Sequence, residues 1–229
     1  MSLFRRAVPL VALSTLVLAG CSSSGPHSDG KAAGKNGASA AGPSGSAASA
    51  VPAGSVGKIP VGTGPQKTYT VQQQPPAGSC HYRYTKDGEP LPDLKCTPGA
   101  TSPAVTQANL AQTICRKGGY TKGIRPPASI TGQEKKLNAA SYGYKGSLAD
   151  AEYDHDLSLQ LGGSPNDPRN LWVQPPDPGH KPGGGINNKK DPVETKLHTA
   201  VCSGKVTLAA AQNAIATDWT TALQSLGLS

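Results

Sequence analysis

The sequence lacks any long hydrophobic run, and this absence sets the first limits on the chain. The apolar stretch at residues 7–19 is too short for a membrane-spanning helix, which needs about 20 apolar residues. Residues 22–78 contain almost no bulky apolar side chains and consist mainly of Gly, Ser, Ala and Pro. Such a segment cannot bury enough surface to offset the entropy lost on ordering. We therefore expect a disordered linker over 22–78 and a single domain with a modest core over 79–229.

A strong charge of one sign is also missing from the expected domain. The whole chain has a formal charge of +8. Residues 76–229, however, hold sixteen Lys or Arg against thirteen Asp or Glu, a balance of +3. This balance is compatible with a polyanionic partner but does not identify one.

The first residues are typical of a targeting segment, because Arg5 and Arg6 precede the short apolar stretch. The stretch ends in Leu-Ala-Gly-Cys, which resembles the lipobox of bacterial lipoproteins. The resemblance implies that residues 1–21 form a lipoprotein signal peptide and that Cys21 carries a lipid. We therefore expect an exported chain, anchored to the outer face of the cell membrane through this lipid, with partial release as an alternative. An ordinary secretory signal is the competing interpretation.

The CxxC spacing of zinc clusters is absent from the other four cysteines. An even number of cysteines in an exported chain favours two disulfides. The sequence allows three pairings. We favour Cys80–Cys96 as a local link and Cys115–Cys202 as a long-range link, and a zinc cluster stays the competing interpretation.

Turn residues and periodicity predict an α+β domain that is mainly helical. They indicate a hairpin or an irregular cap over 80–100, helices over 103–116, 131–143, 190–201 and 206–225, and two short strands between 143 and 190. Thr131 and Glu134 form a capping-box pattern, which predicts a helix start. Leu157, Leu159 and Leu161 alternate with polar residues, which predicts that they continue the first of the two strands.

The stretch YDHDLSLQLGGSPNDPRNLW, residues 153–172, concentrates the candidate chemistry. Asp154 offers a carboxylate, a ligand suited to a hard divalent cation. His155 offers an imidazole, which can take a proton from water near neutral pH. A Gly-Gly turn follows, and Asn170 then begins the second strand, from which it can reach back across the turn. Residues 187–191, NNKKD, open a helix further along.

The D-H pair, the G-G turn, NDPRNLW and the later N-x-K-D resemble an HNH-type nuclease domain, the ββα-metal finger of the His-Me endonucleases. Further motifs resemble a group of secreted actinobacterial HNH-like proteins: CTPGA at 96–100, TIC at 113–115, IRPP at 124–127, YGY at 142–144, NLW at 170–172, VCSGK at 201–205 and AQNAIATDW at 211–219. The likeness covers about residues 79–225. It implies a small, disulfide-stapled domain built around a ββα hairpin plus helix.

The resemblance also implies roles for the residues of the site. His155 would be the general base, and Asn170 would bridge the strands and orient it. Asp154 and Asn188 would hold one divalent metal ion, Mg²⁺ first, with Mn²⁺ or Zn²⁺ as alternatives. Such an ion would stabilise the phosphate transition state.

Other residues near the helix start are secondary candidates. Further metal or supporting ligands would be Asn187, Asp191, Glu194 and His198, although ordinary helix-surface pairing also explains the last three. Phosphate contacts would come from Arg169, Lys189 and Lys190.

Two departures from the resemblance leave two functional hypotheses open. Relatives usually follow D-H with two apolar residues and Pro, whereas this chain has Asp156 and Ser158 there. The third His of the HNH name is also not at its usual place. The first hypothesis is a lipid-anchored, extracytoplasmic endonuclease that hydrolyses phosphodiester bonds of DNA or RNA, with DNA as the first choice. The alternative is a catalytically degenerate HNH-like binding or structural surface domain. No protein partner is implied.

Overall fold

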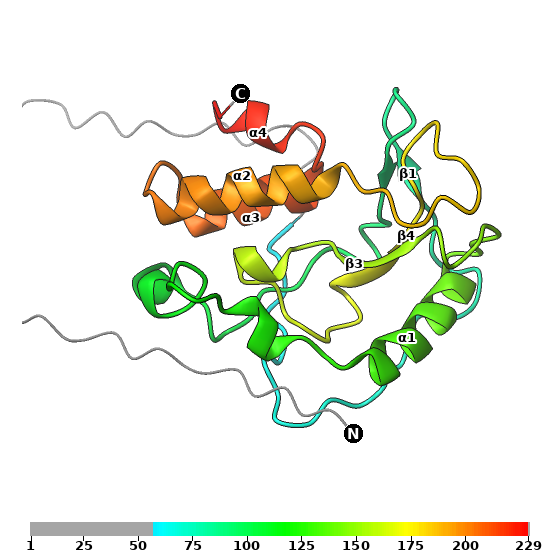
Figure 1. Ribbon diagram of the computed structural model, residues 1–229, viewed down its shortest axis with the longest axis horizontal. Helices are drawn as coiled ribbons and strands as arrows, with labels where there is room; N and C mark the ends of the chain where they lie inside the picture. The colour runs from blue at the N-terminus through cyan, green and yellow to red at the C-terminus, as the bar shows by residue number, and fades with distance from the viewer. Residues whose placement is uncertain (1–56, 229) are drawn as a thin grey trace, which may run out of the picture. The chain divides into compact units, whose positions relative to one another are not determined.

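The computed structural model describes residues 57–228, which Figure 1 shows in colour. This part of the chain contains two two-stranded antiparallel sheets, four α-helices and three short 3-10 helices. The mixed α/β class expected from the sequence is therefore confirmed. The predicted signal peptide and Cys21 lie outside the described residues. Within them, no helix is both long enough and apolar enough to span a bilayer.

Residues 57–78, which the sequence assigned to the linker, pack on the domain. The Tyr69 hydroxyl donates to the backbone oxygen of Ile124 at 2.6 Å. The backbone N–H of Gln72 donates to the Glu134 carboxylate at 2.7 Å. These contacts are polar and mostly use the backbone, so the low hydrophobicity of the segment did not reveal them. The predicted domain boundary at residue 78 is therefore wrong.

The first sheet is the hairpin expected over residues 80–100. Strand β1 (Arg83–Tyr84) pairs antiparallel with β2 (Pro90–Leu91). Gly88 turns the chain between them with φ 82°, a conformation that favours glycine.

Both predicted disulfides are confirmed. Cys80 is bonded to Cys96 and flanks the first hairpin. Cys115 is bonded to Cys202 and joins the segment after helix η1 (Gln107–Gln112) to the end of helix α2.

The second sheet carries the candidate site. Strand β3 (Glu152–His155) pairs antiparallel with β4 (Leu171–Gln174), and His155 lies opposite Leu171. Helix α2 (Lys190–Cys202) follows and begins where the sequence predicts. The chain thus runs strand, strand, helix through this region.

The expected continuation of the first strand is wrong. Leu159–Leu161 instead form the short helix η3. Ser158 caps the start of this helix, since its hydroxyl accepts from the N–H of Gln160. Gly162, with φ 76°, ends it. All three leucines of the alternating pattern are buried, so the alternation did not mark a half-exposed strand.

Three helices also differ from expectation. The helix expected over 103–116 is only the short 3-10 helix η1, residues 107–112. Helix α1 (Ala128–Ser141) starts directly after Pro127, so Thr131 is not its cap. The expected helix over 206–225 is two helices, α3 (Leu208–Thr217) and α4 (Ala222–Ser225). Between them, the Trp219 indole donates to the backbone oxygen of Pro90 at 2.9 Å.

The helices cover the second hairpin from two sides. Figure 1 shows α1 on one side of β3 and β4, and α2 with α3 on the other. The main core joins α2, α3 and α4 to the segment around η3 through buried side chains that include Leu157, Leu161, Leu197, Val201 and Ile215. This packing holds the first turn of α2 against the end of β3.

Candidate functional site

A lysine ammonium lies where the sequence predicted a metal ion. Lys190 is 0% exposed. Its Nζ donates to Asp154 Oδ2 at 2.8 Å, to the backbone oxygen of His155 at 2.8 Å and to Glu194 Oε1 at 2.5 Å. All three N–H groups therefore have acceptors. We call Asp154, His155 O, Lys190 and Glu194 the lysine cage.

Burial and the neighbouring charges shift the pKa values of Asp154, Asp156 and Lys190. Burial raises the pKa of Asp154 to about 7, although Lys190 opposes the shift. Burial also raises the pKa of the neighbouring Asp156 to about 8. For Lys190, burial disfavours the charge, but Asp154 and Glu194 outweigh it and hold the pKa above its usual value. The lysine is therefore ionised at neutral pH.

A divalent metal does not fit this site as it is folded. The oxygens of the cage are hard donors, which Mg²⁺ prefers, but they already surround the ammonium. The predicted ligand Asn188 is held elsewhere: its Oδ1 accepts from Gln174 at 3.0 Å, and its Nδ2 donates to Glu152 at 2.7 Å. Asn187 and Asp191 are exposed. Among the described residues, no hydrogen bond joins either of them to the cage.

The buried ring of His155 has a defined tautomer. Its Nε2 lies 2.9 Å from the backbone oxygen of Pro165. A carbonyl oxygen only accepts, so Nε2 carries the proton and Nδ1 keeps the lone pair. Burial lowers the pKa of His155 to about 4, and the ring is neutral at pH 7. The tautomer suits proton acceptance at Nδ1, but a group with this pKa is a weak base.

Asn170 braces the turn between the two strands. Its Oδ1 accepts from the N–H groups of Leu157 at 2.9 Å and Ala100 at 3.2 Å. Its Nδ2 donates to the backbone oxygens of Leu157 and Ser164, both at 3.0 Å. Among the described residues, no hydrogen bond joins Asn170 to His155. The side chain therefore bridges the turn through the backbone instead of orienting the imidazole directly.

The three predicted phosphate ligands are already engaged. Lys190 is buried in the cage, so the prediction that it contacts phosphate is wrong. Arg169 binds Asp167 through two hydrogen bonds, of 2.9 and 2.6 Å. Lys189 binds Glu89 at 2.5 Å. Arg169 and Lys189 are exposed, but each has a carboxylate partner.

Burial separates the positive and negative charges of the domain more strongly than the sequence indicated. Fifteen of the eighteen Lys and Arg in the described part are exposed, against two of the thirteen Asp and Glu. Residues 94–133 contain no acidic residue at all. This acid-free run was the signal in the sequence that could have revealed a basic face.

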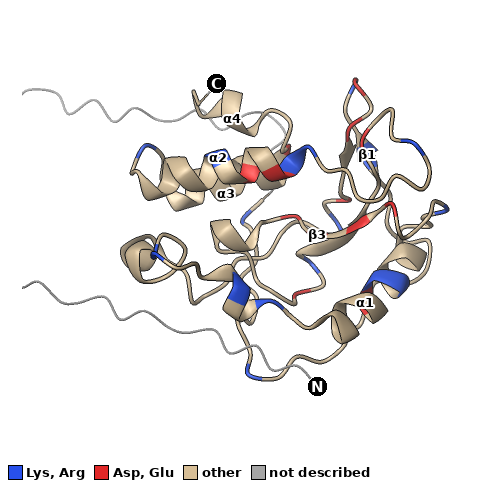
Figure 2. Ribbon diagram, in the orientation of Figure 1, with Lys and Arg blue, Asp and Glu red and all other residues tan. Residues whose placement is uncertain are grey.

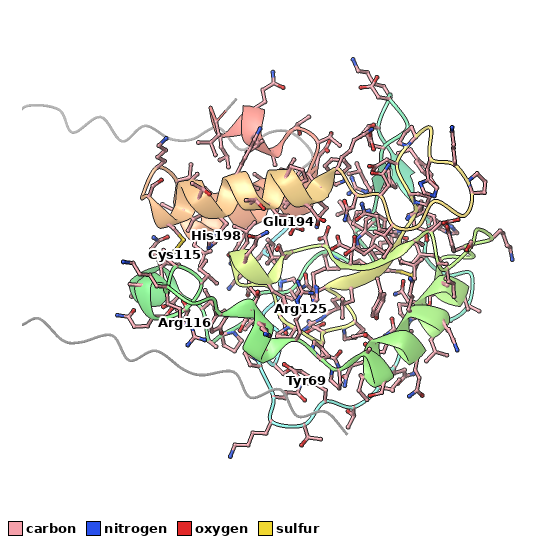
Figure 3. The ribbon with its side chains drawn as sticks, in the orientation of Figure 1. Tyr69, Cys115, Arg116, Arg125, Glu194 and His198 are labelled. Atoms are coloured by element: carbon pink, nitrogen blue, oxygen red, sulfur yellow. A yellow bond between two sulfur atoms is a disulfide. The ribbon has the colours of Figure 1, made fainter. Side chains whose placement is uncertain are left out.

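Four of the five exposed cations of this run, together with Lys67, form what we call the basic surface: Lys67, Arg116, Lys117, Lys122 and Arg125. None of them belongs to an ion pair of the described residues. The Tyr69–Ile124 hydrogen bond joins the segment of Lys67 to the segment of Arg125. Figure 2 colours the Lys and Arg positions blue, and Figure 3 labels Tyr69, Arg116 and Arg125 in the part of the chain below α2.

His198 does not join the predicted helix-face group, because Glu194 is in the lysine cage. Its Nε2 instead lies 3.3 Å from Cys202 Sγ and 2.9 Å from the backbone oxygen of Ile114. Cys115, His198 and Cys202 place one ligand atom each within 4.8 Å of the others, so this group could hold a metal ion. Its two sulfurs are joined as a disulfide in this structure.

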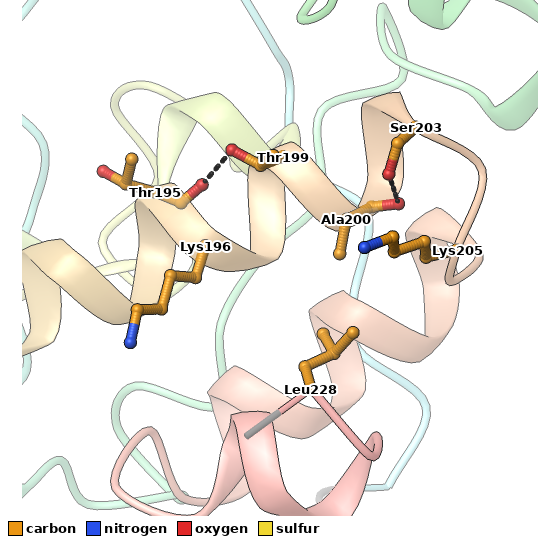
Figure 4. Close-up of a pocket in the computed structure, with 7 residues that line it drawn as sticks. All are labelled: Thr195, Lys196, Thr199, Ala200, Ser203, Lys205 and Leu228. Atoms are coloured by element: carbon orange, nitrogen blue, oxygen red, sulfur yellow. Dashed lines mark hydrogen bonds between the residues drawn. The ribbon is translucent and has the colours of Figure 1, made fainter.

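A surface pocket lies elsewhere on α2, and Figure 4 shows its lining. It is lined by Thr195, Lys196, Thr199, Ala200, Ser203, Lys205 and Leu228. The hydroxyls of Thr199 and Ser203 donate to backbone oxygens of α2 itself. The pocket thus offers two exposed lysines and no buried polar group aimed into it, and we assign it no role.

Comparison with known proteins adds no further constraint. The chain matches no protein-family model, no curated protein and no solved structure. Its chemistry must therefore be inferred from its own residues.

Proposed function

We propose that the domain is a non-catalytic, nucleic-acid-binding module on an HNH-like ββα scaffold in which Lys190 replaces the metal ion. The burial of the Lys190 ammonium among three oxygens carries this proposal. An ammonium has no coordination position for a phosphate oxygen and cannot lower the pKa of a bound water as a metal does. The order of β3, β4 and α2 and the brace at Asn170 support the scaffold.

The basic surface supports an anionic partner. Within residues 57–228 its five exposed cations form no ion pair, so a phosphate backbone could bind there without first breaking one of these pairs. DNA is the first choice of partner. Each phosphate neutralised on duplex DNA contributes about −0.9 to the slope of log K against log salt, so binding at the basic surface should weaken as salt rises. A lipid on Cys21 would hold the module at the outer face of the membrane.

A metal-dependent endonuclease is the second candidate. It is favoured by His155, whose hydrogen bond to Pro165 O leaves Nδ1 as the proton acceptor. This candidate predicts DNA cutting that needs both His155 and added Mg²⁺ or Mn²⁺.

One experiment separates the candidates. The chain, with its disulfides formed, is titrated with duplex DNA and with RNA at several salt concentrations, and plasmid cutting is followed in parallel with Mg²⁺ or Mn²⁺. The test variant replaces Lys117, Lys122 and Arg125 with Gln. The matched control replaces Lys136, Lys145 and Lys181, which are equally exposed, with Gln.

We expect the test variant to reduce the salt slope by about 3, three contacts at about 0.9 each, and the control to change it little. No variant should cut. Cutting that disappears in His155→Ala and with a chelator would establish the nuclease instead. A folded chain that neither binds nor cuts would contradict both candidates and leave a structural surface domain.

A further inference from the structure

The Cys115–Cys202 disulfide has a histidine beside it. His198 and Cys202 are four residues apart on α2, so their side chains lie on one face of the helix. Cys115 reaches the same place from the segment after η1. The Cys80–Cys96 disulfide differs, because its sulfurs lie beside the hydroxyl and the backbone oxygen of Ser79.

The ligand types and their separation fit zinc. Thiolate and imidazole are its usual protein ligands, with Zn–S about 2.3 Å and Zn–N about 2.0 Å. Tetrahedral angles at these lengths place the ligand atoms about 3.5–3.8 Å apart. The atoms of this group lie within 4.8 Å of one another, so small side-chain rotations would suffice. Three protein ligands would leave the fourth position to water.

We propose that Cys115, His198 and Cys202 form a redox-controlled zinc site. In the oxidised state the S–S bond occupies both sulfurs and excludes the metal. A dithiol reductant transfers two electrons and two protons to the disulfide, which yields two cysteine thiols and the oxidised, cyclic form of the reductant. Zn²⁺ then binds both sulfurs as thiolates and His198 as neutral imidazole, and two protons are released.

The surroundings allow this exchange. Cys202 is exposed and Cys115 is half-buried, so a small dithiol can reach the bond. His198 Nε2 would give up its hydrogen bond to the backbone oxygen of Ile114, and the ring proton would move through solvent to Nδ1, which frees the Nε2 lone pair for the metal. Zinc would then keep Cys115 tied to α2 as the disulfide does. Arg116, the residue of the basic surface that directly follows Cys115, would stay in place in both states.

The test uses Co²⁺ and Zn²⁺ on the full chain with Cys21, Cys80 and Cys96 replaced by Ser. In this background Cys115 and Cys202 are the only cysteines that remain. After reduction and removal of the reductant, we expect one equivalent of Co²⁺ to bind with thiolate-to-cobalt absorption. The oxidised chain should show none. Zn²⁺ should displace Co²⁺ and protect Cys115 and Cys202 from alkylation, which peptide mass spectrometry reads directly.

Substitution of the ligands gives the second readout. Cys115→Ser and Cys202→Ser should abolish the absorption. His198→Gln should weaken Zn²⁺ binding at least as much as loss of an outer partner does, about 10–100-fold. Thr199→Val, also on α2 but outside the group, should bind like the background. Absence of the absorption, equal binding by His198→Gln, or a reduced chain that stays unfolded with Zn²⁺ would each overturn the proposal.

Discussion

Replacing Lys190 with Met tests whether the chain supplies its own cation. Methionine fills most of the space of the lysine stem but leaves the carboxylates of Asp154 and Glu194 without their partner. Breaking a buried ion pair from one side costs about 3–5 kcal/mol. For a domain of this size, 1 kcal/mol shifts Tm by roughly 2–4 °C. We therefore expect Tm to fall by roughly 6–20 °C in the presence of a chelator.

The same variant should gain a response to metal. Two facing carboxylates and a backbone oxygen are ligands for a hard cation once the ammonium is gone. Mg²⁺, Mn²⁺ or Ca²⁺ at about 100 times its Kd would restore about 2.7 kcal/mol. The wild-type chain should show no such shift, because Lys190 holds the position.

Calorimetry or circular dichroism melts of the full chain, with chelator or with each ion, measure both effects. Lys189→Met is the matched control, since Lys189 is adjacent but exposed, and its Tm should stay close to that of the wild type. The cage is refuted if Lys190→Met is as stable as the wild type. It is equally refuted if the divalent ions stabilise both proteins to the same extent.

Three further outcomes are expected. Asn170→Ala leaves buried backbone groups of Leu157, Ala100 and Ser164 without partners, each worth about 1–3 kcal/mol, so urea unfolding should show a loss of at least about 3 kcal/mol. Asp156 has a folded pKa of about 8 against about 3.9 unfolded, so the folded state binds the extra proton and stability falls as pH rises from about 4 to 8. Asp156→Asn should therefore stabilise the domain more at pH 8 than at pH 5, and an equal gain at both would contradict the assignment. Replacing Cys80 and Cys96 with Ser opens a loop of sequence separation 16 and should cost about 3 kcal/mol in thermal melts.

The features predicted correctly from the sequence are those with local causes. The hairpin depends on the turn at Gly88, where the positive φ favours glycine. The start of α2 follows from residues that are adjacent in the chain. The two disulfides follow from an even count and from the contrast between a short and a long separation.

The features predicted wrongly depend on distant partners. Glu134 looked like a capping residue, but its carboxylate accepts from Gln72, sixty-two residues earlier in the chain. The same bond explains why residues 57–78 pack on the domain despite their linker-like composition. Polar contacts between distant backbone segments leave no periodic pattern, so composition alone placed the boundary too late.

Lys190 shows the same limit at the site itself. A lysine among polar residues at a helix start is usually exposed, and this is why the sequence favoured a phosphate contact. Its burial requires three acceptors at once: Glu194 one helical turn later, and Asp154 and His155 O on a strand thirty-five or thirty-six residues earlier. The i, i+4 pair is visible in the sequence, whereas the strand partners become visible only when β3 is placed against α2. Without Lys190 the two carboxylates would repel each other and the backbone oxygen of His155 would stay unpaired. The lysine and the Asp-His strand therefore depend on each other. Neither should be interpreted as a metal or phosphate site without the other.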